Sequence, residues 1–550
     1  MSSALQSLVS TSTQLLTPLA VTISAYVFCK LARFVWWEYV SNPLSDFPGP
    51  ANPSWIYGNM KQIRDAENSV LHEAWTREFG KTIKYKFFFG RSRLYTTDLK
   101  AIYHVLMNSQ TYQKPEQSRL FLSRLLGDGV LVVEGDKHRE QRKVMNPAFG
   151  ASQIRELTEI FVEKALELRD SWTTEIKEQS KGVSHTCRIN VIQGLSRMTL
   201  DVIGLAGFSY NINALKGEKN ELSDAFNTLF SFNPRLTIFM FLRIMLGRFD
   251  FLLPAETDRP TNQARASMDR IGKQLLRESK EAIAREGKDE TFKRRDLLSL
   301  LLKANMSTNI PESQRMSDAD VLAQVPTFLV AGHETTSNST TWALYALSLR
   351  PDVQSKLREE LFTVHTDNPS MDELNDLPYL DAVVRETLRV HAPVPSTMRV
   401  ATEDDVVPLG TPFVDQKGRE RNVLEIRKGQ TIFIPILAIN RSTEIWGEDA
   451  GEFRPERWQS VPEAAGTIPG IWGNMLTFLG GQRACIGYRF SLVETKALLF
   501  TLVRAFEFKL AVSVDEIGKK SAIVQRPVLK SDPKGRTQMP LLITPYERVD

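Results

Sequence analysis

The stretch that decides the fold is FLGGQRACIG, residues 478–487 of a 550-residue chain. It places Cys485 in a glycine-rich loop, with Arg483 two residues before it. A cationic neighbour and free backbone N–H groups favour the thiolate form of a cysteine, and a thiolate can bind a metal directly. No second cysteine or histidine lies nearby, so this is not a zinc pattern. A single thiolate indicates a macrocycle that supplies the other metal ligands, although a lone cysteine in such a loop can also be structural or nucleophilic.

A second motif carries charges that a helix would bring together. Glu386 and Arg389 in VVRETLRVHAP are three residues apart and lie on one face of a predicted helix. Arg457 follows about 70 residues later in FRPERW. An isolated pair of this kind would be an ordinary surface ion pair of little energetic value.

A third motif is LVAGHETTSNST, residues 329–340. Ala331 and Gly332 offer a low-profile patch that a flat cofactor or O₂ can approach. Glu334 and Thr335 place an acid beside an alcohol, and such a pair can relay protons. Taken alone, the motif is better explained as the polar face of a helix.

A fourth motif is the basic stretch EGDKHREQRKVMNPAF, residues 134–149. His138 and Arg142 are one helical turn apart, and Arg399 stands in PSTMRVATEDD further along the chain. The other basic side chains of the stretch point elsewhere on the helix and form a solvated face or a docking patch for an acidic partner: Lys137, Arg139 and Lys143.

Together these motifs resemble those of the cytochrome P-450 family, in family order and at family spacing. The haem-binding pattern F-x-x-G-x-R-x-C-x-G is matched by Phe478, Gly481, Arg483, Cys485 and Gly487. One departure is Leu479, where the family usually has a small residue, and it bears on the packing of the loop. The resemblance covers about residues 45–550 and is of the microsomal, fungal-like type.

The resemblance implies roles for the motif residues. Cys485 is expected to be the axial ligand of the iron of haem b, and Thr335 and Glu334 are expected to be catalytic in O₂ activation. A structural charged cluster is expected from Glu386, Arg389 and Arg457. The expected cofactor-binding residues are Phe478, Arg483 and Gly487 of the loop, together with Arg142, Arg399 and His138 at the haem propionates. His138 stands in a position where the family commonly has tryptophan, and an imidazole N–H can make the same hydrogen bond.

The amino-terminal region predicts a membrane anchor in residues 1–40, with a span at about residues 15–35. Lys30 and Arg33 close the span, so the positive-inside rule places the body on the cytoplasmic side. We therefore expect a single-pass protein of the endoplasmic reticulum membrane; a cleaved signal peptide is the alternative. A proline-rich hinge at 41–55 is expected to precede the haem domain at 56–550.

The resemblance implies a mainly α fold with small β-sheets, in one large haem domain behind the transmembrane helix. Helical periodicity is clearest at 152–178, 318–349, 351–364 and 376–391, and strand-like runs lie near residues 85, 95 and 430. The phenylalanine-rich segment 226–253 indicates either core packing or a channel wall or second membrane contact.

The implied function is that of a haem-thiolate monooxygenase, which inserts one atom of O₂ into a lipophilic small molecule such as a terpenoid or other secondary metabolite. The resemblance implies electrons from NADPH through a separate NADPH–cytochrome P-450 reductase. An oxygen-independent isomerase or dehydratase and a non-catalytic haem-binding protein are the alternatives. A net charge of only +4 gives no indication of a nucleic-acid partner, and three cysteines cannot form a disulfide framework. The pocket is expected from residues 113–130, 226–253 and the stretch after Arg389, with Phe121, Leu122, Leu125, Val394 and Pro395.

Overall fold

The computed structural model describes most of the chain: residues 35–180, 186–218, 258–286, 295–306, 315–521 and 523–548, with shorter pieces between 18 and 33 and between 220 and 225. The predicted span at 15–35 is described only in pieces, and the phenylalanine-rich segment 226–253 falls entirely outside the described residues. Within the part of the chain that is described, no helix has both the length and the apolar character needed to cross a bilayer.

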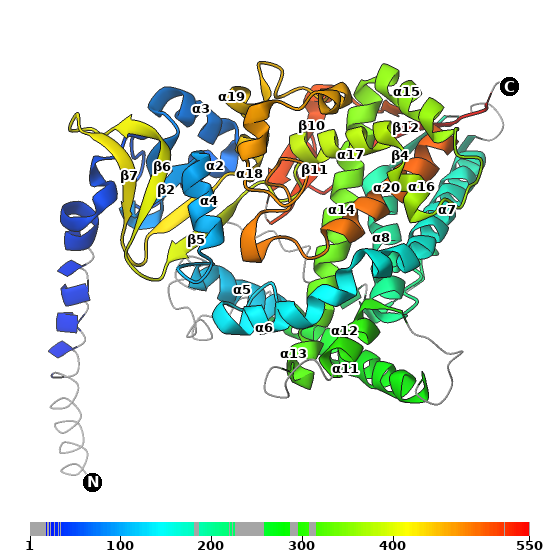
Figure 1. Cartoon of the computed structure of the whole chain (residues 1–550), viewed down its shortest axis with the longest axis horizontal. Helices are drawn as coiled ribbons and strands as arrows, with labels where there is room; N and C mark the ends of the chain where they lie inside the picture. Colours follow the sequence, from blue (N-terminus) through cyan, green and yellow to red (C-terminus); the bar gives the residue numbers. More distant parts are fainter. Residues whose placement is uncertain are drawn as a thin grey trace, which may run out of the picture.

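Helices form most of the described chain (Figure 1). Their bounds are α2 (Met60–Asp65), α3 (Val70–Phe79), α4 (Leu99–Met107), α5 (Glu116–Leu126), α6 (Gly135–Met145), α7 (Ala151–Ser180), α8 (Val191–Phe208), α11 (Asp258–Glu286), α12 (Leu297–Met306), α13 (Asp318–Leu322), α14 (Gln324–Leu349), α15 (Pro351–Leu361), α16 (Met371–Asn375), α17 (Pro378–Val390), α18 (Ile436–Asn440), α19 (Thr443–Trp446) and α20 (Tyr488–Ala505).

The strands are short and form small sheets. They are β1 (Thr82–Lys86), β2 (Ser92–Thr96), β3 (Tyr112–Gln113), β4 (Cys187–Asn190), β5 (Thr397–Ala401), β6 (Asp405–Val414), β7 (Glu420–Ile426), β8 (Thr431–Ile434), β9 (Phe506–Leu510), β10 (Ile517–Ser521), β11 (Gln525–Leu529) and β12 (Pro540–Pro545). The largest sheet has the order β1-β2-β8-β5-β3, with β2 and β8 parallel and its other pairs antiparallel. The remaining sheets are β4-β12-β9, β6-β7 and β10-β11. This architecture confirms the predicted mainly α fold with small sheets.

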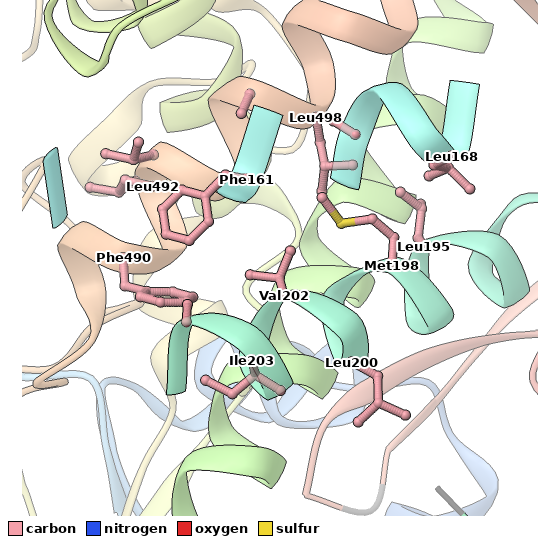
Figure 2. Close-up of a cluster of buried hydrophobic side chains, with 14 of the residues drawn as sticks. Phe161, Leu168, Leu195, Met198, Leu200, Val202, Ile203, Phe490, Leu492 and Leu498 are labelled. Atoms are coloured by element: carbon pink, nitrogen blue, oxygen red, sulfur yellow. The ribbon is translucent and has the colours of Figure 1, made fainter. Parts of the chain in front are cut away.

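The largest hydrophobic core lies among the long helices. Figure 2 shows part of it, where Phe161 of α7 and Met198 of α8 lie near Leu498 of α20. Buried apolar residues recur every three or four positions along α7, for example at Ile154, Leu157 and Phe161, and this spacing gives the helix one apolar face. Burial of these faces holds α7 against both α8 and α20.

Helix α14 packs against both α8 and α20, and it carries the polar motif. The segment before it is capped by Ser317, whose hydroxyl accepts a hydrogen bond from the backbone N–H of Asp320 at 3.2 Å. Ala323 separates α13 from α14, and Pro326 follows in the first turn of α14, where a missing N–H costs least. The proline therefore stands at the start of the long helix and leaves the rest of it unbroken.

Candidate active site

Cys485 lies in the loop just before α20. Its backbone N–H donates to the carbonyl oxygen of Phe478 at 2.8 Å, which closes the loop. Burial raises the pKa of the Cys485 thiol, and both the N–H of Gly487 and the charge of Arg142 oppose this shift. The side chain is nevertheless exposed. The sulfur is therefore enclosed by the body of the protein and is still accessible to ligand atoms.

Two glycines of the loop are required by close packing against the backbone. A Cβ at Gly480 would lie 1.8 Å from the carbonyl oxygen of Pro469, and one at Gly481 would lie 2.4 Å from that of Leu106. Gly481 also has a positive φ of 68°, which favours glycine. Gly487 differs, because the nearest atom that its Cβ would meet is 3.8 Å away on Phe149.

Leu479, the departure from the family pattern, adopts a left-handed backbone with φ of 55°. That conformation costs about 1–2 kcal/mol for an L residue. Its side chain packs against a second hydrophobic core, which includes Leu44, Ile434 and Leu476, and this contact offsets part of the cost. Phe478 is buried between the rings of Trp472 and Tyr488, with centroids 5.7 and 6.0 Å away. The loop therefore accommodates the larger residue without losing its closing hydrogen bond.

The predicted basic residues gather on the segments around this loop. Arg142 of α6 donates to the carbonyl oxygen of Ala484, the residue before the cysteine. Arg483 donates to the carbonyl oxygen of Val133 at 2.8 Å, and burial lowers the pKa of Arg483 to about 10. Burial, together with the charges of Lys114 and Arg142, lowers the pKa of His138 to about 4. The imidazole is therefore neutral at physiological pH and can donate one hydrogen bond.

Three further members of this charged cluster could not be predicted from the sequence: Lys114, Arg119 and Glu134. Burial, followed by the charges of Arg483, Arg399 and Arg119, lowers the pKa of Lys114 well below its usual range. The buried Nε of Arg119 has no hydrogen-bond partner. Glu134 pairs with Arg483 and lies 3.7 Å from the Nζ of Lys114. No local motif marks these residues, because they reach the cluster from separate segments.

Arg399 lies on β5 and is buried, and burial lowers its pKa to about 10. It donates to the hydroxyl of Thr397 at 2.9 Å and to the carbonyl oxygen of Met398 at 2.8 Å. In the described part of the chain no carboxylate pairs with it. Buried cations usually have an anionic partner, so the cluster as a whole has an excess of positive charge that an anion would balance.

These residues fit haem b. Its two propionates would supply the missing anions, with Arg142, Arg399 and His138 as candidate donors beside Lys114 and Arg119. Cys485 would bind the iron from the loop, with the Gly487 N–H directed at its sulfur. When bound, a thiolate-ligated haem supplies the O–O bond cleavage from which one oxygen atom reaches a substrate.

The acid and the alcohol of the third motif lie next to each other on α14. The Thr335 hydroxyl donates to the carbonyl oxygen of Ala331 at 2.6 Å, and Ala331 itself is exposed. Glu334 is mostly buried and forms an ion pair with Arg526 of β11. Burial raises the pKa of the Glu334 carboxyl, and Arg526 opposes the shift. The motif did not reveal Arg526, which comes 192 residues later in the chain.

The expectation for Gly332 was wrong. We expected it to form, with Ala331, an open patch for a cofactor or O₂. A Cβ at Gly332 would instead lie 2.8 Å from the Cδ1 of Ile203 on α8. Gly332 is therefore explained by close packing of two helices. The neighbouring His333 is buried, and its Nε2 lies 2.7 Å from the hydroxyl of Ser196 on α8, so it strengthens the same contact.

The structure brings Glu386, Arg389 and Arg457 together in a buried cluster. The guanidinium of Arg389 makes two hydrogen bonds with the carboxylate of Glu386, at 2.7 and 2.9 Å, and both side chains are fully buried. Arg457 lies 3.4 Å from the same carboxylate and also donates to Asp449 at 2.7 Å. Arg389 further donates to three backbone carbonyls, those of Asn440, Ala450 and Glu452. The cluster ties α17 to the segments that precede the cysteine loop.

Comparison with known proteins gives the family. The family model described as cytochrome P-450 matches residues 48–531. Two cytochrome P-450 monooxygenases of the fungus Postia placenta, numbered 205 and 128, are 54% and 51% identical, covering 97% and 96% of this chain and 99% and 97% of their own lengths. The monooxygenase claW of Ampulloclitocybe clavipes is 34% identical, over 96% of this chain and 97% of its own. Since the matches span nearly the whole chain, including the Cys485 loop, this chain belongs to the cytochrome P-450 family of haem-thiolate monooxygenases and is of fungal type.

Proposed function

We propose that this protein inserts one atom of O₂ into a lipophilic small molecule, with electrons from NADPH delivered by a separate flavoprotein reductase. The observation that carries the proposal is Cys485 in its closed loop, surrounded by cations that outnumber their carboxylate partners. Glu334 and Thr335 favour O₂-dependent chemistry over isomerisation or dehydration, because only the former needs a proton relay. Terpenoids and other secondary metabolites are the substrate classes we favour.

Apolar side chains support a lipophilic substrate. Helix α5 contacts α14, which carries Thr335, and contributes Phe121 and Leu125. Phe121 is 46% exposed, a large value for a phenylalanine in this part of the body. Val394, which follows α17, packs against the second core. These residues offer apolar contact to a substrate and few hydrogen-bonding groups.

The reductase would dock on the exposed side of α6. Lys137 and Arg139 expose 50% and 57% of their side chains there, and each also pairs with a carboxylate, Lys137 with Asp320 and Arg139 with Asp136. The same helix carries Arg142, whose guanidinium contacts the carbonyl of the residue before Cys485. A basic surface this close to the thiolate loop would attract an acidic electron donor and bring it near the haem.

We further propose that residues 1–40 anchor the protein in the endoplasmic reticulum membrane, with the haem domain in the cytoplasm. Apolar and aromatic side chains near the amino terminus are exposed, including Phe28 at 72% and Trp36 at 63%. Glu38 in the short helix Trp37–Ser41 is buried, and it accepts hydrogen bonds at 2.9 Å from Lys86 and from the backbone of Ser92. The anchor would therefore join the haem domain at a fixed position, next to Glu38.

Deletion of residues 2–35 is expected to release most of the protein from membranes while haem content stays unchanged. The deletion stops short of Glu38 and so keeps its contacts with the sheet. Carbonate-washed membranes and the soluble fraction are compared for haem and protein. Retention of the shortened protein in the pellet would move the membrane contact to residues 226–253. A mature amino terminus beyond residue 25 would indicate a cleaved signal and a lumenal enzyme.

Replacement of Thr335 by alanine is expected to uncouple NADPH consumption from product formation. The change removes the hydroxyl but little helix propensity, so folding and haem loading survive. Protons then reach O₂ less efficiently, and more hydrogen peroxide is released. General acid–base catalysis contributes roughly 10²–10⁴-fold, which sets the upper scale of the loss, and water can replace part of it.

The measurement is product and peroxide formed per NADPH, with reductase present and with the parent enzyme as control. An unchanged product-to-NADPH ratio in Thr335→Ala would contradict the relay assignment. Product formed by the parent without any NADPH would support the oxygen-independent alternative instead.

A further inference from the structure

The surface of α7 carries an open groove that is separate from the haem site and has a volume of about 490 Å³. Its lining residues on α7 are three or four positions apart and therefore form one stripe along the helix. They are Glu167, Asp170, Ser171, Thr174, Glu175 and Glu178, and Leu215 and Lys216 line the other wall. From Glu167 to Glu178 the stripe is about 16 Å long, which is the length of about five residues of extended chain.

The groove has an excess of acidic side chains. Four of its lining residues are carboxylates, and Lys216 is basic. Glu167 and Asp170 are each paired with a lysine or arginine of the same helix. In the described part of the chain, neither Glu175 nor Glu178 has a cationic partner. The last turn of a helix adds partial negative charge at this end of α7, so the groove attracts positively charged side chains.

The groove continues into a smaller and more enclosed compartment of about 80 Å³ between α7 and α8. Ser171, Glu175 and Leu215 line both spaces, which shows that the two are continuous. The inner compartment is lined by several hydrogen-bond donors: Trp172, Asn190, Gln193 and Arg197. A space of this size suits a small polar group, and its donors suit an anionic one.

The donors of the inner compartment are available to a ligand. Trp172 is 2% exposed, and its indole N–H has no hydrogen-bond partner among the described residues. Gly194 leaves that nitrogen uncovered, because a Cβ there would lie 2.7 Å from the indole Nε1. The side-chain oxygen of Asn190 accepts the N–H of Met539 at 2.8 Å, which leaves its NH₂ group for another acceptor. Arg197 is exposed and forms no ion pair with any described residue. A buried donor without an acceptor is costly, and a bound carboxylate would remove that cost.

We propose that this groove binds the carboxyl-terminal end of a partner polypeptide that finishes in basic residues. The terminal carboxylate enters the inner compartment and accepts hydrogen bonds from Trp172, Asn190 and Arg197. The basic side chains that precede it lie along α7, beside Glu175 and Glu178. Capture of a chain terminus in this way is a known mode of peptide recognition. The proposal goes beyond the monooxygenase function and does not depend on it.

The groove and α6 attract different partners. The exposed basic side chains of α6 suit an acidic electron donor, whereas the groove on α7 suits a basic segment. Helix α7 and strand β4 lie at the opposite end of the body from the hairpin β6-β7 (Figure 1). The amino-terminal segment lies beside that hairpin, since Asp46 pairs with Lys417 and Arg419. A partner held at the groove therefore occupies the end of the body away from the proposed anchor.

The first test compares two tetralysine peptides with the same fluorophore at the amino end, one with a free carboxyl end and one amidated. Fluorescence polarisation with the full-length haem protein measures Kd. The free-acid peptide is expected to bind about tenfold more tightly, because its carboxylate makes charge-assisted hydrogen bonds. Attraction to an acidic surface alone gives the opposite order, since the amidated peptide has one more net positive charge. Equal affinities, tighter binding of the amide, or no binding of either peptide would overturn the proposal.

The second test assigns the two ends of the peptide to the two spaces. Trp172→Phe and Arg197→Gln are each expected to weaken the free-acid peptide about fivefold and to leave the amidated peptide nearly unchanged. Glu178→Gln should weaken both peptides, by about threefold. Glu163→Gln is the matched control, because Glu163 is on the same helix with 66% of its side chain exposed but does not line the groove. This control should bind both peptides as the parent does.

Equal losses in Glu163→Gln and Glu178→Gln would show that binding follows net charge and would rule out the groove as the site. Unchanged binding of the free-acid peptide in Arg197→Gln would rule out the inner compartment; this variant decides alone if Trp172→Phe unfolds at lower urea than the parent, because Arg197 is exposed. Free lysine serves as a competitor that has both charges but no chain. It should displace the free-acid peptide only far above the Kd of that peptide, and displacement near that Kd would contradict a polypeptide ligand.

Discussion

Arg389→Leu is expected to destabilise the protein by about 3–5 kcal/mol, because it leaves the carboxylate of Glu386 buried without its main partner. Glu386 is fully buried, and its remaining polar contacts are longer: Arg457 at 3.4 Å, the indole N–H of Trp458 at 3.1 Å and the backbone N–H of Arg454 at 3.0 Å. The change also removes the donor to three backbone carbonyls, which become unsatisfied in the interior. Haem loading should fall with stability, since the cluster supports the segments leading to the cysteine loop.

The measurement is the free energy of unfolding in urea, followed by tryptophan fluorescence. Arg454→Ala provides the matched control, because Arg454 pairs with Asp449 through a side chain that is 52% exposed. Exposed pairs contribute about 0–1 kcal/mol, so this variant should unfold almost as the parent does. Equal loss of stability in the two variants would show that the buried cluster has no special structural role.

Local patterns predicted much of the fold. The predicted helices at 152–178 and 376–391 correspond to α7 (Ala151–Ser180) and α17 (Pro378–Val390), because apolar spacing of three and four is a property of a few consecutive turns. The Glu386–Arg389 pair could be predicted for the same reason, because residues three apart lie on one face of a helix. The hairpin β6-β7 was not predicted, since only two residues of each strand alternate as buried apolar side chains and the other positions are half-buried or exposed.

Partners from distant segments could not be predicted. Arg526 reaches Glu334 across 192 residues, and Lys114 and Glu134 reach Arg483 from another part of the chain. No local pattern encodes such contacts, which depend on how helices and sheets pack. The same limit explains Gly332, whose role is set by its packing against Ile203 of α8.

Cys485→Ala is expected to abolish oxygenation and reduce activity to the background rate. The variant removes the sulfur but keeps the backbone hydrogen bond to Phe478 and the close packing at Gly480 and Gly481, so the loop should keep its shape. What is lost is the thiolate, whose electron donation to iron favours O–O cleavage. Haem retained by the cations around His138 and Arg142 would therefore be inactive.

The other cysteines serve as controls. Cys187 is buried, and its thiol donates to the side-chain oxygen of Gln179 at 2.8 Å, so it has a structural partner of its own. Cys29 lies near the amino terminus and is exposed. Replacing either cysteine by alanine should therefore leave activity at the parent level.

The most direct measurement of the central claim is the absorption spectrum of the reduced protein with carbon monoxide, recorded for the parent, Cys485→Ala, Cys187→Ala and Cys29→Ala at equal haem content. Thiolate ligation by Cys485 predicts a strongly red-shifted Soret band in the parent, Cys187→Ala and Cys29→Ala, and its absence in Cys485→Ala. A shifted band that persists in Cys485→Ala, or one that disappears in Cys187→Ala or Cys29→Ala, would contradict the assignment of Cys485 as the ligand of the haem iron.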